Sequence, residues 1–335
     1  MVIEMKIIGI IVEYNPLHNG HLYHFNKIKE ENPDSKVIAV MSSSFTMRGD
    51  LSIFDKFTKT NHALKLGIDI VIELPFVYTV ERADIFAQNA VKILNLMNVN
   101  EIWIGSEENN TSIYEKYYNE KIQIDNKDNY NIELKTIKRI DSSYLDLNPK
   151  SDNIASALAI RINLELLNEY TPIFVNKDIN KILDEKLLFN YLKYKILNDN
   201  KNELKSIFFV DEGLENKLYE IKNYNSYDEF INSLVSKRYT KTRIKRMLTY
   251  ILFNIKKDEI NKIYNNDINF VRILGFNNNG KEYINKIKKD INIYTNIKEN
   301  INEIFDIELK ISKILDFIFN LDLMKKEQSG PIKKE

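Results

Sequence analysis

The sequence contains no cysteine, has equal numbers of acidic and basic residues, and lacks any long apolar run. The absence of cysteine excludes disulfides and thiol chemistry, which is compatible with a reducing cytosol. Because Lys and Arg together number 48, as do Asp and Glu, a nucleic acid could be bound only through a local basic region. No apolar segment could cross a bilayer, and the N-terminus lacks the basic region and cleavage site of a signal peptide. We therefore expect a cytoplasmic protein that does not interact with membranes.

Histidine is also scarce, yet three of the four histidines, His18, His21 and His24, fall within seven residues. A surface turn that happens to carry histidines is one interpretation. A metal site is a second, but the spacing matches no zinc pattern and no cysteine can complete it, so we predict no metal ligand. In the third interpretation, the sequence His-x-Gly-His binds the phosphates of ATP. Gly20 then lets the backbone approach the triphosphate, while His18 and His21 donate hydrogen bonds to the α-phosphoryl group.

The residues around this motif predict a strand, a tight loop and a helix. Residues 7–12 are apolar and mostly β-branched, as in a strand buried on both faces. Asn15-Pro16 ends the strand, because proline cannot donate to a ladder. Leu22, Phe25 and Ile28 then recur at helical spacing. The histidines therefore lie where a helix N-terminus can receive a phosphate.

The first hundred residues alternate between strand and helix patterns, which predicts an α/β fold with a Rossmann-like, doubly wound parallel sheet. We expect strands at residues 6–13, 37–41, 70–74 and 101–104, and helices at 21–31, 56–66 and 81–97. Ligands of such sheets bind at the carboxyl ends of the strands. Polar residues follow three of these ends, at 13–15, 42–44 and 105–107.

Several residues near this edge have a second, purely structural interpretation. Ser42 to Ser44 could contact a substrate or simply cap a helix, and Arg48 could bind phosphate or lie in a solvated loop. We expect Lys56 to be an ordinary surface lysine and Trp103 to belong to the core.

The second half of the chain contains two further candidate binding segments, a capped helix that carries an arginine and a basic helix. Ser156 is placed to cap a helix from which Arg161 could reach a β- or γ-phosphate. After residue 170 strand patterns largely stop, and residues 237–246 are rich in Lys and Arg. An apolar stripe from Ile244 to Ile255 predicts a helix packed on a core. Its other face is either an ordinary solvated face or an RNA-binding surface on which Tyr239 could stack with a base.

The N-terminal half resembles the bacterial tRNA(Met) cytidine acetate ligase family of the HxGH nucleotidyltransferase superfamily. The resemblance covers most of the chain apart from its middle, and the C-terminal part matches at 272–276 and 280–281. The N-terminal strings that carry it are VEYNPLHNGHLYH at 12–24, VMSS at 40–43, MRGD at 47–50, GID at 67–69, VIELPF at 71–76 and ADIFA at 83–87.

The resemblance implies an enzyme that activates acetate with ATP as acetyl-adenylate and passes the acetyl group to N4 of the wobble cytidine of elongator tRNA(Met). Magnesium would screen the phosphates. The implied organisation is an ATP-binding domain at residues 1–170, a mostly α-helical tRNA-binding domain at 171–323, and a polar tail at 324–335 that we expect to be frayed.

The implied site residues fall into three sets. The catalytic residues are His18 and His21. The nucleotide-binding residues are Ile11, Val12, Glu13, Tyr14, Asn15, Pro16, Leu17, Asn19, Gly20, His24, Gly105, Arg139 and Arg161. The tRNA-binding residues are Arg238, Lys241, Arg243, Lys245 and Arg246.

Two other functional classes stay open at this stage. A small-molecule adenylyltransferase would use the same loop but would not need a large helical domain with a basic face. A tRNA-binding homologue that has lost catalysis would explain residues 108–135, where, by the family resemblance, the chain departs from its relatives and is shortened. The sequence does not determine the oligomeric state.

Overall fold

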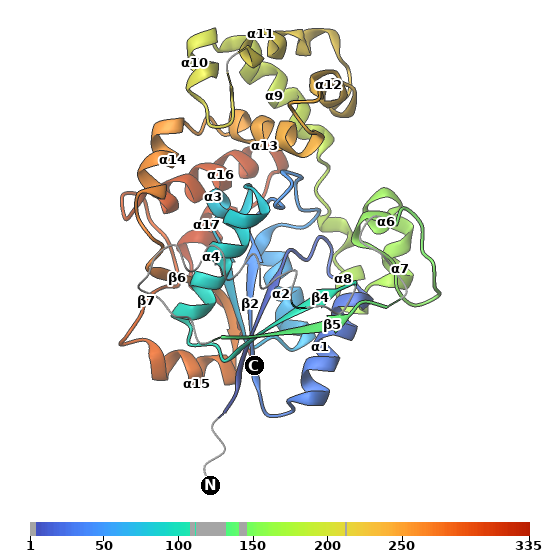
Figure 1. Ribbon diagram of the computed structural model, residues 1–335, viewed down its shortest axis with the longest axis vertical. Helices are drawn as coiled ribbons and strands as arrows, with labels where there is room; N and C mark the ends of the chain where they lie inside the picture. The colour runs from blue at the N-terminus through green and yellow to red at the C-terminus, as the bar shows by residue number, and fades with distance from the viewer. Residues whose placement is uncertain (1–4, 108–110, 112–131, 141–145, 212) are drawn as a thin grey trace.

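The computed structural model describes residues 5–107, 111, 132–140, 146–211 and 213–335. Its centre is a sheet with the strand order β5-β4-β1-β2-β3-β6-β7, in which β8 also pairs with β6 (Figure 1). Strands β1 to β5 are parallel. The strands are β1 (Ile7–Val12), β2 (Lys36–Ser42), β3 (Ile70–Leu74), β4 (Glu101–Ser106), β5 (Glu133–Lys138), β6 (Phe270–Asn277), β7 (Asn292–Tyr294) and β8 (Ile332–Lys334).

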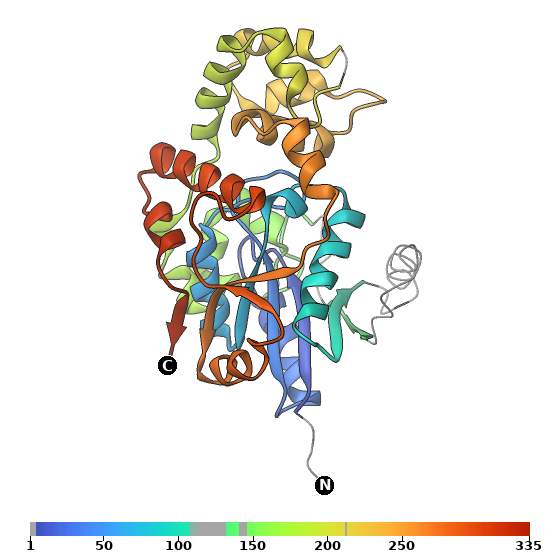
Figure 2. The same ribbon diagram turned by 90° about the vertical axis from the view of Figure 1, so that its left-hand side faces the viewer.

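The predicted Rossmann-like fold is confirmed. The expected strand at 70–74 and the expected helix at 56–66 have the predicted bounds, and the other N-terminal elements differ by a few residues at their ends. The central strands β1, β2 and β3 are buried almost throughout, because helices cover both faces of the sheet. Helices α2 and α4 lie on opposite faces (Figure 2). The N-terminal helices are α1 (Asn19–Glu31), α2 (Lys56–Leu66), α3 (Phe76–Thr79) and α4 (Ala83–Leu96).

The second half is largely helical, as expected, and α9 to α13 lie together beyond one end of the sheet (Figures 1 and 2). Its helices are α6 (Ala157–Ile162), α7 (Leu167–Tyr170), α8 (Ile173–Asn176), α9 (Lys186–Asn198), α10 (Lys201–Ser206), α11 (Leu214–Leu218), α12 (Tyr227–Leu234), α13 (Lys241–Leu252), α14 (Lys257–Tyr264), α15 (Asn278–Ile287), α16 (Glu303–Phe319) and α17 (Leu323–Gln328). Short 3₁₀ turns occupy Leu164–Leu166, Ile179–Lys181 and Tyr219–Asn223. None of the helices in the described residues is both long enough and apolar enough to span a bilayer.

The C-terminal part has one feature that the sequence does not predict, and one expectation for it is wrong. Strands largely stop after residue 170, as expected, but β6 pairs antiparallel with β3 and so adds the C-terminal part to the N-terminal sheet. Residues 324–335 are not a frayed tail, because α17 packs against α16 and β8 joins the sheet beside β6. The segment is polar in composition, which is why the sequence predicts a frayed tail. One of its polar residues, Glu327, is nevertheless fully buried and paired with cations from other elements, and this pairing orders the segment.

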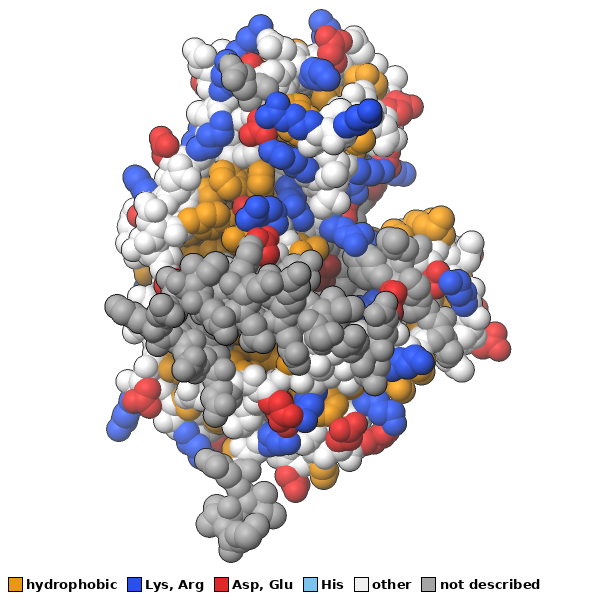
Figure 3. Space-filling view, viewed as in Figure 1, with side chains coloured by type: hydrophobic (Ala, Val, Ile, Leu, Met, Phe, Trp, Pro, Cys, Tyr) orange, Lys and Arg blue, Asp and Glu red, His pale blue; other side chains and the backbone are white. Residues whose placement is uncertain are grey.

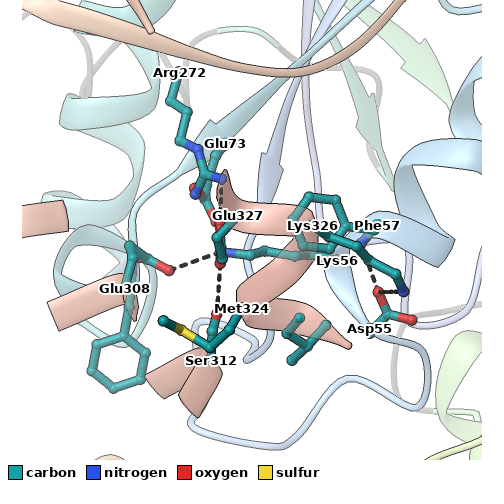
Figure 4. A network of polar contacts seen from close by, with 12 residues as sticks. Asp55, Lys56, Phe57, Glu73, Arg272, Glu308, Ser312, Met324, Lys326 and Glu327 are labelled. Atoms are coloured by element: carbon teal, nitrogen blue, oxygen red, sulfur yellow. Dashed lines mark hydrogen bonds and ion pairs between the residues drawn. The ribbon is translucent and has the colours of Figure 1, made fainter. Parts of the chain in front are cut away.

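Those cations belong to a buried ion cluster that we define as Lys56, Glu73, Arg272, Glu308 and Glu327 (Figure 4). The Lys56 ammonium lies 2.6 Å from carboxylate oxygens of both Glu73 and Glu327, and 3.2 Å from Glu308. The expectation of a surface lysine at position 56 is therefore wrong. The cluster joins α2 and β3 to the C-terminal elements β6, α16 and α17.

Candidate functional site

A cavity of about 260 Å³ opens at the carboxyl ends of β1, β4 and β5, beside the N-termini of α1 and α6. This is the edge at which the strand pattern predicts a ligand. The lining residues are Ile11, Val12, Glu13, Tyr14, Asn15, His18, Gly20, His21, Tyr23, His24, Trp103, Ile104, Gly105, Ile137, Lys138, Arg139, Ile140, Ile154, Ala155, Ser156, Ala157 and Arg161.

The two histidines of the motif form a reciprocal cap at the start of α1. The Gly20 amide donates to His18 Nδ1 at 3.0 Å, and the His18 amide donates to His21 Nδ1 at 3.2 Å. Because each Nδ1 accepts a hydrogen bond, the ring proton of each neutral imidazole must reside on Nε2. The two rings lie with centroids 4.0 Å apart. The cap therefore fixes both histidines in the tautomer that offers an Nε2–H donor.

The environment keeps these imidazoles uncharged at neutral pH. Burial, followed by the positive charges of Arg139 and Arg161, lowers the pKa of His18 to about 3. Burial and the neighbouring His18 lower the pKa of His21 well below its usual range. Burial and Arg139 lower the pKa of His24 to about 4. The histidines can therefore donate hydrogen bonds to an anion, but they are not poised as cationic acids.

Two arginines predicted to bind phosphate also line the cavity. Arg161 lies on α6, whose N-terminus is capped by Ser156 Oγ, which accepts from the Ala159 amide at 2.9 Å, as predicted. The Arg161 guanidinium donates to the Asn15 carbonyl at 2.6 Å. Arg139 follows β5 and approaches Gly105, where an added Cβ would lie 3.4 Å from Nε. The cavity thus combines two guanidinium groups with two neutral donors.

The turn after β1 is held by contacts that the sequence did not reveal. Tyr14 has a φ of +47°, in the left-handed region that non-glycine residues rarely adopt. The Met47 amide donates to the Glu13 carboxylate at 2.6 Å, and the Ile53 amide donates to Asn15 Oδ1 at 2.8 Å. Burial raises the pKa of Glu13. No sequence signal identifies Met47 or Ile53, because both act through their backbone.

Most predicted nucleotide-binding residues line the cavity, but Pro16, Leu17 and Asn19 do not. Leu17 is a core residue, and the Asn19 amide group donates to the carbonyls of Asn153 and Glu169. Ser42, Ser43 and Ser44 are buried, and none of them is among the residues that line the cavity. Trp103 is buried, as expected, although it also borders the cavity.

The predicted basic helix is α13, and its apolar stripe is buried as expected. Its cations have acidic or carbonyl partners from other elements: Lys245 pairs with Asp50, Arg243 with Asp211, Lys241 with Asp228, and Arg246 Nε donates to the Met47 carbonyl at 2.8 Å. Lys and Arg side chains gather on this part of the molecule, with acidic side chains between them (Figure 3).

Tyr239 is not available for stacking with a base, because it is buried and two guanidinium groups cover its ring. Arg238 lies 5.3 Å and Arg243 5.1 Å from the ring centroid. Tyr239 instead holds Arg238, which lies just before α13, and Arg243, which lies in its first turn.

No metal centre is evident in the part of the chain that the structure describes, where no three His, Asp or Glu side chains come together in a ligating arrangement. The departure of residues 108–135 from the family falls almost entirely on residues outside those described.

Comparison with known proteins gives one consistent answer. The family model described as HIGH Nucleotidyl Transferase matches residues 5–130 and 120–330. A tRNA(Met) cytidine acetate ligase of Fusobacterium nucleatum is 35% identical over 89% of this chain and 91% of its own. The enzyme of the same name from Bacillus subtilis is 30% identical over 92% of both chains.

Solved structures agree with this result. Apo TmcAL of Thermotoga maritima superposes with a TM-score of 0.83 at 25% identity, covering 98% of this chain and 99% of that one. A second crystal form of the same protein, bound with alpha-thio ATP, superposes with a TM-score of 0.80 at 23% identity. The match covers 98% of this chain and 100% of that one, and it shows the shared fold.

Proposed function

The chain belongs to the tRNA(Met) cytidine acetate ligases of the HIGH nucleotidyl transferase family, and we propose that it activates acetate with ATP and acetylates N4 of the wobble cytidine of elongator tRNA(Met). The observation that carries this proposal is the pair of imidazoles at the start of α1, both fixed as neutral Nε2–H donors in a cavity that also holds Arg139 and Arg161. A Thermotoga maritima relative was crystallised with an ATP analogue.

In the proposed first step, an acetate oxygen attacks the α-phosphorus of ATP and pyrophosphate leaves, giving acetyl-adenylate. Negative charge grows on the α-phosphoryl oxygens, where the Nε2–H groups of His18 and His21 would donate. Arg139 and Arg161 would hold the β- and γ-phosphates. Arg161 would do so while still tied to the Asn15 carbonyl, since a guanidinium has five N–H donors.

In the second step, the cytidine N4 amine attacks the acetyl carbon, loses a proton and displaces AMP. Magnesium would enter with the triphosphate, because Mg²⁺ keeps several waters and is bound largely through substrate phosphates. ATP and tRNA are both cytoplasmic molecules, so the proposed reaction places the protein in the cytoplasm.

Acetate-dependent ATP–pyrophosphate exchange tests the first step. We expect His18→Ala and His21→Ala each to lower the exchange rate by about 10²-fold, because each removes a donor to transition-state charge. The matched control is His62→Ala, which removes the fourth histidine. His62 pairs with Asp178 outside the cavity wall, so exchange per folded molecule should be retained. Exchange with another carboxylate or phosphate acceptor would favour a small-molecule adenylyltransferase, and none at all would favour a binding homologue.

The tRNA-binding role of Arg238, Lys241, Arg243, Lys245 and Arg246 is part of the same proposal. These residues lie on or directly before α13, which contacts the 46–50 segment next to the cavity. An RNA held there would lie close to the adenylate. The acidic partners Asp228 and Asp211 are 75% and 32% exposed, so phosphates could replace them at little cost. Asp50, the partner of Lys245, is only 19% exposed.

Arg243→Ala combined with Arg246→Ala should weaken tRNA binding and reduce the slope of log K against log salt by about 0.9 for each phosphate that the variant no longer neutralises. Filter binding across a salt series measures both quantities. Lys281→Ala combined with Lys286→Ala is the matched control, because α15 lies at the opposite end of the molecule from α9 to α13 (Figure 1). An unchanged salt slope in the arginine variant would identify α13 as an ordinary solvated face.

A further inference from the structure

Lys59 is a fully buried lysine whose side-chain nitrogen contacts only neutral oxygens among its hydrogen-bond partners. It donates to the Glu13 carbonyl at 2.9 Å, to the Ser42 carbonyl at 2.9 Å, and to the Ser42 and Ser52 hydroxyls at 3.2 and 3.1 Å. A buried amino group without a carboxylate in direct contact is costly, so this placement is not explained by a stabilising ion pair.

Those partners belong to the three segments that converge behind the cavity. Glu13 follows β1 and lines the cavity, Ser42 ends β2, and Ser52 lies in the loop between β2 and α2. Lys59 is therefore the point at which α2 is bonded to the carboxyl ends of two neighbouring strands. Lys59 does not itself line the cavity.

The turn that Lys59 contacts adopts an unfavourable backbone conformation. Its central residue, Tyr14, has a φ of +47°, and such residues persist only where the surroundings hold them in place. The turn leads directly to His18, whose own amide donates to His21. Tyr14 also contacts the His21 ring edge-on, with centroids 4.9 Å apart. A displacement of this turn would therefore displace both imidazoles.

We propose that Lys59 is a positioning residue of the acetate-activating site: by bonding the Glu13 carbonyl to β2 and to the 43–55 loop, it fixes the turn that places His18 and His21. This inference rests on the proposed function for its catalytic consequence. Its structural part, that Lys59 orders residues 13–18, stands independently.

The test compares Lys59→Met with Lys36→Met. Lys36 is also buried and also donates to a backbone carbonyl, that of Asn279 at 2.6 Å, but it begins β2 and so lies at the opposite edge of the sheet. Two readouts are measured on each folded variant. The first is kcat and KM for ATP in acetate-dependent exchange, and the second is amide hydrogen exchange of residues 13–18.

We expect Lys59→Met to lower kcat at least about tenfold while KM for ATP changes less than about threefold, because misplaced donors weaken transition-state binding more than substrate binding. Amide exchange of residues 13–18 should accelerate. Lys36→Met should change neither quantity. Ser52→Ala removes one acceptor only and gives a milder test, with about three- to fivefold lower kcat and the same local acceleration.

Unchanged amide exchange in residues 13–18 of both Lys59→Met and Ser52→Ala would overturn the positioning role. A loss of kcat matched by Lys36→Met would also overturn it, since the effect would then be general. If the wild-type protein shows no acetate-dependent exchange, the proposed function fails, whereas the amide-exchange comparison still decides whether Lys59 orders the turn.

Discussion

Lys56 and Lys59 lie one turn apart on α2, and neither has exposed surface, yet their surroundings differ completely. Lys56 contacts three carboxylates, whereas Lys59 contacts carbonyl and hydroxyl oxygens. Burial alone lowers the pKa of either lysine, but Glu327, Glu73 and Glu308 outweigh it at Lys56 and raise the pKa there. At Lys59 burial prevails and lowers the pKa to about 7.

The comparison shows that burial does not determine what a charged side chain does. In the ion cluster every cation is neutralised by a carboxylate, so the cluster can only hold elements together. At the cavity, the Arg161 guanidinium donates to the neutral Asn15 carbonyl, and the imidazoles of His18 and His21 are uncharged. These groups can therefore still donate to an added anion, while Lys59 bonds the Glu13 carbonyl behind them. One helix therefore serves both the stability of the fold and the geometry of the site.

The largest expected effect is on stability at Lys56. Lys56→Met leaves Glu73, Glu308 and Glu327 with Arg272 as their only cation in the cluster, and breaking such a buried network costs about 3–5 kcal/mol of unfolding free energy. Lys59→Met leaves neutral acceptors unpaired, which costs about 1–3 kcal/mol, but it also removes the cost of burying an amino group whose pKa is lowered, so its net loss should be much smaller than that of Lys56→Met. Urea unfolding at pH 7 measures both. Equal losses for the two variants would break the distinction between the two lysines.

The sequence predicts the α/β part well because its signals are local. Helix α2 has an apolar pattern, a capping Asp55 that accepts from the Phe57 and Thr58 amides, and Gly67 in the left-handed region at its end. The edge at which ligands bind follows from strand direction, which is why residues 13–15 and Gly105 could be placed together in advance, whereas Arg161 is assigned from its capped helix and from the family resemblance.

What the sequence could not predict depends on partners distant along the chain. The sequence predicts a surface position for Lys56 because its partners Glu308 and Glu327 lie far away along the chain. For the same reason the sequence does not indicate that residues 324–335 are ordered. Met47 and Ile53 contact the turn after β1 through their backbone amides, so their side-chain types do not predict these contacts.

A smaller effect concerns the pH dependence of stability at Lys59. Between pH 7 and its ordinary pKa of 10.5, Lys59 binds a proton in the unfolded chain but has largely lost it in the folded one. The unfolded state then binds more protons, so the unfolding free energy rises with pH, by at most about 1.4 kcal/mol per pH unit for this group. The groups that act on Lys59 are Glu13, Asp55, Glu73 and Lys56.

Unfolding in urea is followed from pH 7.5 to 9, below the range in which tyrosines ionise, and the difference between wild type and Lys59→Met isolates this contribution. Lys59→Met should flatten the rise, because methionine carries no proton to exchange. Lys36→Met should retain the rise, because this change lies at the other edge of the sheet and leaves Lys59 and its hydrogen-bond partners in place. A rise of equal steepness in Lys59→Met would mean that Lys59 stays charged in the folded protein, as Lys56 does, and the contrast between the two lysines would then rest on geometry alone.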